Sequence, residues 1–203
     1  MSRKAVDVVL LPAEVMMDRA IEANRELARK YGEKIVLNRE NCLPHISLAM
    51  GCIEEGGIAA VEEVLKSLAE GNSLGELRVI GIQASTSSVG EAASVFEVEK
   101  TRELQLLHEE IMEKLASHLS YDVTADMLYN PAEVGESTLL WIKNYREKSS
   151  FANFFPHITI GYGEMNDLPV PIQFTVSRLA LCHLGNHCTC REILASIKVS
   201  TRP

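Results

Sequence analysis

The stretch Pro44-His45-Ile46-Ser47-Leu48 recurs with small changes as Pro156-His157-Ile158-Thr159-Ile160, in the second half of the chain. In each copy a histidine and a hydroxyl residue alternate with aliphatic residues, and a glycine follows within a few positions. This alternation is typical of a β-strand, in which every second side chain points to the same face. We therefore expect two similar strands, each presenting one imidazole and one hydroxyl group on a single face.

Two such strands, side by side, would form a site for a phosphate group. Histidine titrates near neutral pH, so one imidazole can accept a proton while the other donates one. Hydroxyl groups can donate hydrogen bonds to phosphoryl oxygens, where negative charge is held. The motifs predict that His45 and His157 form an acid/base pair and that Ser47 and Thr159 bind the phosphate. Which histidine is the acid stays open, and the scheme needs no metal and no other cofactor.

A structural role is the alternative interpretation of both histidines. A histidine in a strand can be satisfied by neighbouring backbone carbonyls, and a single His-x-Thr says little about function. Repetition of the whole motif, with its proline and its flanking aliphatic residues, favours the functional interpretation.

The doubled motif resembles the 2H phosphoesterase superfamily, which includes proteins similar to 2′-5′ RNA ligases and to cyclic nucleotide phosphodiesterases. The resemblance covers most of the chain, because the order of strands and helices around each motif also fits. It implies a bilobal α+β fold with a cleft that holds both motifs. It also implies action on 2′,3′-cyclic phosphates, 2′-5′ linkages or related nucleotide phosphodiesters, with His45 and His157 as the acid/base pair and Ser47 and Thr159 as the phosphate-binding hydroxyls.

The chain departs from many RNA-acting relatives in the residue that follows the second motif. Those relatives have a basic residue there, whereas this chain has Tyr162, with Met50 at the matching place in the first half. The formal charge of −8 also disfavours broad nucleic-acid binding, which relies on dense lysine and arginine. We expect a small nucleotide or an RNA end as substrate, with Tyr162 and Phe155 as candidates to stack on a base.

Length and composition are typical of one domain. The 203 residues, 46% of them hydrophobic, can bury a sizeable core. The repeated order of elements predicts an α+β fold of two pseudo-symmetric lobes, roughly 1–100 and 101–203, with possible exchange of strands between them. We expect antiparallel sheets to line a central cleft, with the helices outside. No apolar run is long enough to cross a membrane, and the first residues do not read as a signal peptide. We expect a cytoplasmic monomer.

Periodicity and turn residues predict the individual elements. Helices are expected at 12–31, at 58–70, from the N-cap Thr101 to a point between 118 and 121, and at 137–148. Strands are expected at 5–11, near 36, and at 46–51, 77–85, 95–99 and 157–162. A closing hairpin of 172–184 and 188–199 is expected around Gly185-Asn186.

Five cysteines leave two further hypotheses open. In a cytosolic chain we expect reduced thiols rather than disulfides. If Gly185-Asn186 is a two-residue turn, His183 faces Cys188 with Cys190 on the same face, and a zinc ion could bind there. The spacing matches no standard zinc signature, so this cluster, with Cys182 and His187, is taken as structural, and no metal ligand is predicted. The two rival functions are a zinc-stabilised structural protein and a module that binds a phosphorylated ligand without catalysis.

Overall fold

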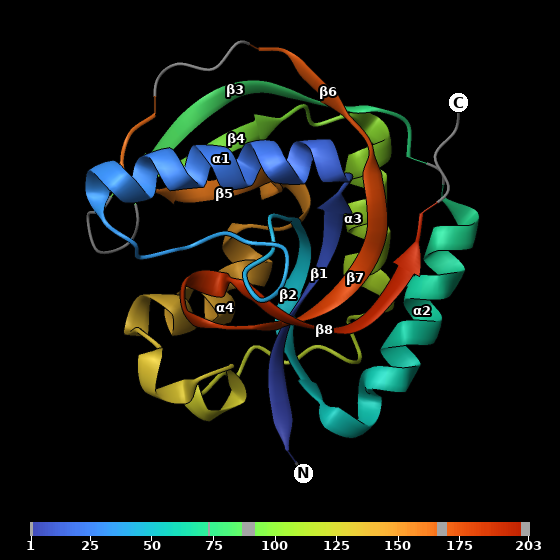
Figure 1. The fold of residues 1–203 in the computed structure, drawn as a ribbon. Coiled ribbons are helices and arrows are strands. Elements are labelled where there is room, and N and C mark those ends of the chain that lie inside the picture. The colour runs from blue at the N-terminus through green and yellow to red at the C-terminus, as the bar shows by residue number, and fades with distance from the viewer. Residues whose placement is uncertain (1, 73, 87–91, 166–169, 200–203) are drawn as a thin grey trace.

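The structure, a computed structural model, describes residues 2–72, 74–86, 92–165 and 170–199. In these residues the chain forms four α-helices and two four-stranded sheets (Figure 1). The helices are α1 (Glu14–Tyr31), α2 (Ile58–Gly71), α3 (Arg102–Lys114) and α4 (Glu136–Lys148). The strands are β1 (Arg3–Pro12), β2 (Ile46–Glu54), β3 (Leu77–Thr86), β4 (Ala92–Val98), β5 (His157–Tyr162), β6 (Ile172–Phe174), β7 (Val176–Leu184) and β8 (Cys190–Lys198).

Each sheet combines strands from both halves of the sequence. One sheet has the order β2-β1-β7-β8 and contains the first motif in β2, and the other has the order β5-β4-β3-β6 and contains the second motif in β5. Neighbouring strands are antiparallel throughout both sheets. The α+β class and the antiparallel character predicted from the sequence are confirmed.

Strand β1 lies between β2 and β7, and its apolar run explains this central position. A strand that is covered on both faces is typically rich in aliphatic residues, and 5–11 are aliphatic except for Asp7. Val6, Val8 and Leu10 belong to the main core, in which full burial of each large side chain contributes roughly 1.5–3 kcal/mol. The other face joins a smaller apolar cluster, which consists of Val9, Leu11, Leu43, Ala180, Cys182 and Cys190.

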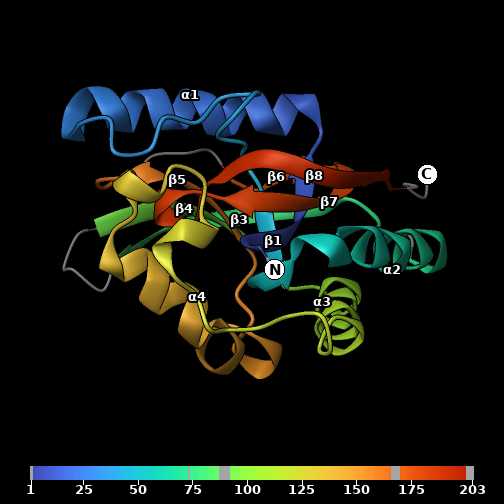
Figure 2. The same cartoon turned by 90° about the horizontal axis from the view of Figure 1, so that it is seen from below.

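Helix α1 lies on one side of the strands, whereas α3 and α4 lie on the opposite side (Figure 2). Asn24, a buried residue of α1, holds β5 in place, because its amide Nδ2 donates to the carbonyl of Ile160 at 3.0 Å. The same nitrogen also donates to the carbonyl of Ile35 at 2.9 Å. Gly161, with a φ of 130°, allows this approach, since a Cβ there would lie 2.8 Å from Asn24 Nδ2. The helix thus sets the position of the strand that carries the second motif.

Four local predictions are wrong. The expected strand 172–184 is two strands, β6 and β7, because the chain leaves one sheet after β6, which pairs with β3, and enters the other sheet in β7. Residues near 36 form no strand; instead Leu37 donates its backbone N–H to Asn24 Oδ1, so this segment is pinned to α1. Helix α3 ends at Lys114, although hydrogen-bonded turns continue to Leu119. The connection between β7 and β8 covers 185–189 and includes a short 3₁₀ turn, so Gly185-Asn186 is not a two-residue hairpin loop.

The remaining helix predictions agree with the structure to within two residues at each end, apart from the end of α3. Thr101 is the N-cap of α3, and its side chain accepts the backbone N–H of Leu104. None of the helices in the described part of the chain has the length and apolar character that a membrane crossing requires.

Candidate active site

The second motif lies in a strand from its histidine onward, as its alternation predicts, and the first lies in a strand from Ile46 onward. His45 directly precedes β2, and His157 is the first residue of β5. The aliphatic residues of each motif are fully buried, whereas the histidines and the hydroxyl residues Ser47 and Thr159 are half-buried. The histidine and the hydroxyl residue of each copy therefore share the accessible face of their strand, as period-two alternation requires.

The two motif strands are in contact, although they belong to different sheets. The two imidazoles are also near enough to interact, since the charge of His157 lowers the pKa of His45. The structure thus brings together two segments that are far apart in the sequence.

Each histidine has the same hydrogen bond on one ring nitrogen. Nδ1 of His45 lies 2.7 Å from the carbonyl oxygen of Leu43, and Nδ1 of His157 lies 2.7 Å from that of Phe155. A carbonyl can only accept a hydrogen bond, so Nδ1 carries the hydrogen and Nε2 of the neutral ring is left as the basic atom. The backbone thus satisfies one nitrogen of each ring, as the structural interpretation expects, yet it leaves the other nitrogen to exchange a proton.

Burial favours the neutral form of both rings. Desolvation lowers the pKa of His45 to about 4, against an opposing effect of the Leu43 carbonyl and with a small further decrease from His157. Desolvation also lowers the pKa of His157 from its usual value, again opposed by a backbone hydrogen bond. Without a bound anion, both imidazoles are proton acceptors at neutral pH.

Asp7 is a member of this site that the sequence analysis did not identify. Its carboxyl group is fully buried, and its Oδ2 accepts the hydroxyl of Ser47 at 2.6 Å and lies 3.9 Å from Nε2 of His45. Desolvation raises the pKa of Asp7 well above its usual range, although the hydrogen bonds from Ser47 and the Ala49 backbone lower it. The available signal was a single charged residue inside an otherwise aliphatic strand.

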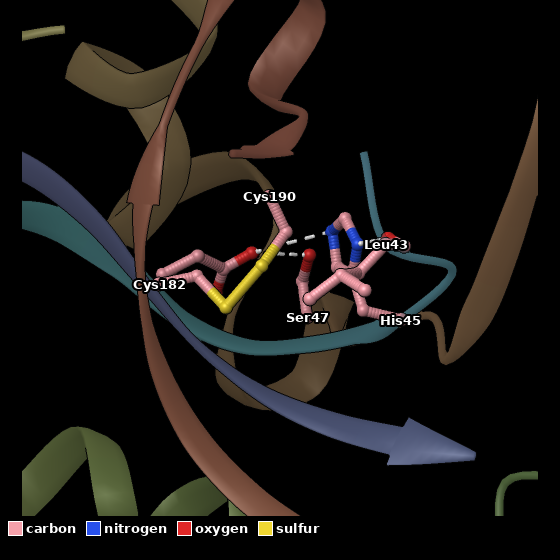
Figure 3. Close-up of a disulfide and its surroundings, with 6 residues drawn as sticks. Leu43, His45, Ser47, Cys182 and Cys190 are labelled. Carbon is pink, nitrogen blue, oxygen red and sulfur yellow. Dashed lines mark hydrogen bonds and ion pairs between the residues drawn. A yellow bond between two sulfur atoms is a disulfide. The ribbon is translucent and has the colours of Figure 1, made fainter. Parts of the chain in front are cut away.

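Cys182 and Cys190 form a disulfide beside the first motif, so the prediction of reduced thiols is wrong for this pair. Figure 3 shows the disulfide next to Ser47 and His45. The bond crosses from β7 to β8, where both residues are buried in the smaller apolar cluster and their Cα atoms are 5.5 Å apart. Cys42, Cys52 and Cys188 are free. The cytoplasmic location stays a prediction, and a disulfide is less usual there.

The hairpin does not have the geometry on which the zinc hypothesis depends. Because the connection is longer than two residues, His183 pairs with Glu192 across the strands and not with Cys188. Its Nε2 lies 3.0 Å from the carbonyl oxygen of Met127. Two of the cysteine sulfurs are bonded to each other and so are not thiolate ligands. Among the residues that the structure describes, no three His, Cys, Asp or Glu side chains are grouped so as to hold a metal ion.

The two aromatic residues proposed to stack on a base differ in their surroundings. Phe155 is 40% exposed, and its ring is stacked on that of His157, with 5.3 Å between the ring centroids. Tyr162 is half-buried, its hydroxyl lies 2.9 Å from Nδ1 of His187, and Lys34 lies over its ring. Phe155 therefore lies at one of the candidate catalytic histidines, whereas Tyr162 is engaged by His187 and Lys34.

The fold is similar to solved structures across nearly the whole chain. A structure of TT0787 of Thermus thermophilus is 14% identical, with a TM-score of 0.61 over 98% of this chain and 100% of that one. Escherichia coli LigT complexed with ATP is also 14% identical, with a TM-score of 0.50 over 98% of this chain and 99% of that one. No model of a protein family matches the sequence, and no curated protein matches it.

These likenesses define a fold class: a bilobal α+β fold with two antiparallel sheets, shared with TT0787 and LigT. The resemblance indicated by the doubled motif is thereby confirmed for the fold.

Proposed function

We propose that this protein is a phosphodiesterase of the 2H type that opens a cyclic 2′,3′-phosphate or a 2′-5′-linked nucleotide by acid/base catalysis with His45 and His157. The observation that carries this proposal is the matched geometry of the two motifs. Each histidine is tied through Nδ1 to the carbonyl two residues before it, and each shares its strand face with a hydroxyl residue.

The reaction follows from the protonation states of the two rings. One neutral imidazole accepts a proton at Nε2 from the attacking water, while an imidazolium donates its Nε2 proton to the leaving ribose oxygen. The new P–O bond forms as the bond to the ribose oxygen breaks, and the two rings exchange their protonation states. A phosphodiester anion between the rings favours the imidazolium form, which offsets the desolvation that lowers both pKa values. Thr159 and Ser47 donate to phosphoryl oxygens.

The substrate class is inferred from charge and from the aromatic residues. Phe155 offers an exposed ring beside His157 on which a base can stack. The acidic chain and the buried Met50, at the place where a basic residue would favour RNA, support a short nucleotide over a long polymer. LigT, which shares the fold, is known in a complex with ATP, and this is in keeping with a nucleotide ligand. We propose that the protein acts as a monomer on this substrate.

Hydrolysis of 2′,3′-cyclic AMP by the wild type and by single His45→Ala and His157→Ala variants tests this function. Each replacement should lower kcat/KM by about 10²–10⁴-fold, because each removes one acid/base catalyst. His118→Ala is the matched control, since His118 is a half-buried histidine outside both motifs. A variant of either motif histidine that folds and keeps full activity would refute the assignment.

The runner-up is a module that binds a phosphorylated ligand without turnover. The lack of a basic residue after the second motif motivates it. A nucleotide that raises the melting temperature of the wild type and is recovered unchanged, across cyclic and 2′-5′-linked substrates, would favour this function.

A further inference from the structure

Asp7 lies where an ionised carboxylate is poorly supported. It sits in the middle of β1 and is completely buried, and its Oδ1 has no hydrogen-bond partner in the described part of the chain. Oδ2 accepts the Ser47 hydroxyl, and the backbone N–H of Ala49 also interacts with the carboxyl group. A buried carboxylate needs a cation or several donors, and the basic group within ion-pair distance is His45, at 3.9 Å.

Among the described residues, the other groups around Asp7 add no positive charge. Tyr145 of α4 and Cys188 of the 3₁₀ turn Asn186–Cys188 lie close enough to Asp7 that the charge of Asp7 raises their pKa values. From β7 and β8 comes the disulfide, which does not titrate. His45 is itself desolvated, so its neutral form is favoured. The surroundings of Asp7 therefore favour the protonated carboxylic acid. Burial raises the pKa of Asp7, which also favours this form.

The proton on this group decides what Ser47 can do. If Asp7 is ionised, the hydroxyl hydrogen of Ser47 must point at Oδ2, and a bound phosphate would meet a second negative charge. If Asp7 is protonated, it can donate to Ser47 Oγ across the same 2.6 Å contact. The hydrogen of Ser47 is then free to point at a phosphoryl oxygen.

We propose that Asp7 is a positioning residue of the phosphate site: in its neutral form it donates to Ser47 Oγ and so directs the Ser47 hydrogen to the bound phosphate. This inference rests on the proposed function, because that function assigns the phosphate to Ser47. A neutral Asp7 also leaves His45 as a neutral imidazole, since an ionised carboxylate 3.9 Å away would favour the imidazolium form.

Replacement of Asp7 by an amide separates this role from the alternatives. The Asp7→Asn side chain has nearly the same shape and can donate to Ser47 Oγ, whereas Asp7→Ala cannot. Binding of inorganic phosphate, measured by calorimetry at pH 7, should be kept within about threefold in Asp7→Asn and should weaken by roughly tenfold in Asp7→Ala, as expected for one lost hydrogen bond. Asp126→Asn, at an exposed aspartate, is the control.

Three outcomes of the binding experiment would overturn the proposal. If Asp7→Asn loses as much affinity as Asp7→Ala, the site needs the carboxylate and not a donor. If Asp7→Ala binds phosphate as the wild type does, Asp7 has no part in binding. A wild type that does not bind phosphate overturns it as well.

The pH dependence gives a test that does not require the alanine variant to fold. As the pH rises and Asp7 ionises, the wild type should lose phosphate affinity relative to Asp7→Asn, in which this group does not titrate. Titration of the phosphate itself is common to both proteins and cancels in the ratio. A ratio that stays constant from neutral to alkaline pH contradicts the proposal.

An infrared spectrum shows the proton directly and is independent of activity. With isotope-labelled aspartate, the wild type at pH 7 should show a protonated carboxyl band that is missing in Asp7→Asn. Its absence from the wild type overturns the proposal. If the band and the phosphate binding behave as expected but no cyclic nucleotide is hydrolysed, the proposed function fails while the role of Asp7 in phosphate binding stands.

Discussion

His108 and Leu48 are joined by a hydrogen bond of 2.7 Å, from the imidazole Nδ1 of the helix residue to the backbone carbonyl of the strand residue. The other ring nitrogen, Nε2, accepts the backbone N–H of Phe151 at 2.7 Å, and Phe154 stacks on the ring. Because Nε2 accepts, the buried ring must be neutral with its hydrogen on Nδ1. One imidazole thus connects the strand of the first motif to the segment that leads into the second, and it fixes their separation.

His108→Ala should therefore weaken both the fold and the site. It leaves the buried Leu48 carbonyl and the Phe151 N–H without their partner, and each unsatisfied group costs about 1–3 kcal/mol. We expect the free energy of unfolding, measured with denaturant, to fall by at least about 2 kcal/mol. We also expect kcat/KM to fall, since small displacements of acid/base groups are costly. His118→Ala should change neither quantity, and a His108→Ala variant that matches it would contradict the connecting role.

Stability should decrease as the pH falls from 7 to 5. Burial lowers the pKa values of His45, His108 and His157 in the folded protein, so below about pH 6.5 the unfolded chain binds more protons than the folded one. Protons then favour unfolding. Asp7 acts in the opposite sense, because its pKa is raised on folding.

A double variant, His45→Asn with His157→Asn, isolates the contribution of the two site histidines to this profile. Its stability relative to the wild type should improve as the pH falls, because it lacks two groups whose pKa is lowered by folding. Denaturant unfolding at several pH values measures this difference. A difference that is independent of pH would show that these rings titrate alike in the folded and unfolded states.

The rate profile should be bell-shaped with its maximum below pH 6.5. The profile of kcat/KM reports the free enzyme, in which the pKa of His45 is about 4 and that of His157 is lowered from its usual value. One ring must be charged and the other neutral, so the productive form is most abundant between the two pKa values. Initial rates with 2′,3′-cyclic AMP, taken from about pH 3.5 to about pH 8, measure the profile. A maximum above pH 7 would count against this pair.

Phe155→Ala should change both binding and titration. The ring covers His157 and is exposed enough to stack on a base, and such aromatic contacts contribute about 0.5–1.5 kcal/mol. We expect KM to rise by roughly 2- to 12-fold, with kcat less affected. The pKa of His157, followed by NMR, should move up towards its usual value as the ring is hydrated. Leu106→Ala, at an exposed residue of α3, should leave KM and the pKa of His157 unchanged.

Reduction of the Cys182–Cys190 disulfide should destabilise the fold. The bond closes a loop with a sequence separation of 8, and loop closure of this size is worth about 2–3 kcal/mol through the unfolded state. Denaturant unfolding with and without dithiothreitol measures the change. The double variant Cys182→Ser with Cys190→Ser should be insensitive to the reductant, and an equal effect on this variant would assign the loss to another cause.

The motif strands, most helices and the residues that face the site could be predicted from the sequence. Period-two alternation depends on local geometry alone, so the sequence predicts that the histidine and the hydroxyl residue of each motif, His45 with Ser47 and His157 with Thr159, share a face. The expected end of α3 and the strand near 36 were wrong, because Asn24 and the turns after Lys114 compete successfully with the local pattern.

The nearness of the two motifs, the disulfide and the role of Asp7 were decided by the tertiary structure. A sequence pattern specifies which face a side chain takes, but not which strand lies beside it. The pairing of β1 with β2 and β7 puts Asp7 under Ser47 and beside Cys182, and the burial that follows shifts its proton affinity. Desolvation depends on every atom that packs around a group, so it has no local signature in the chain.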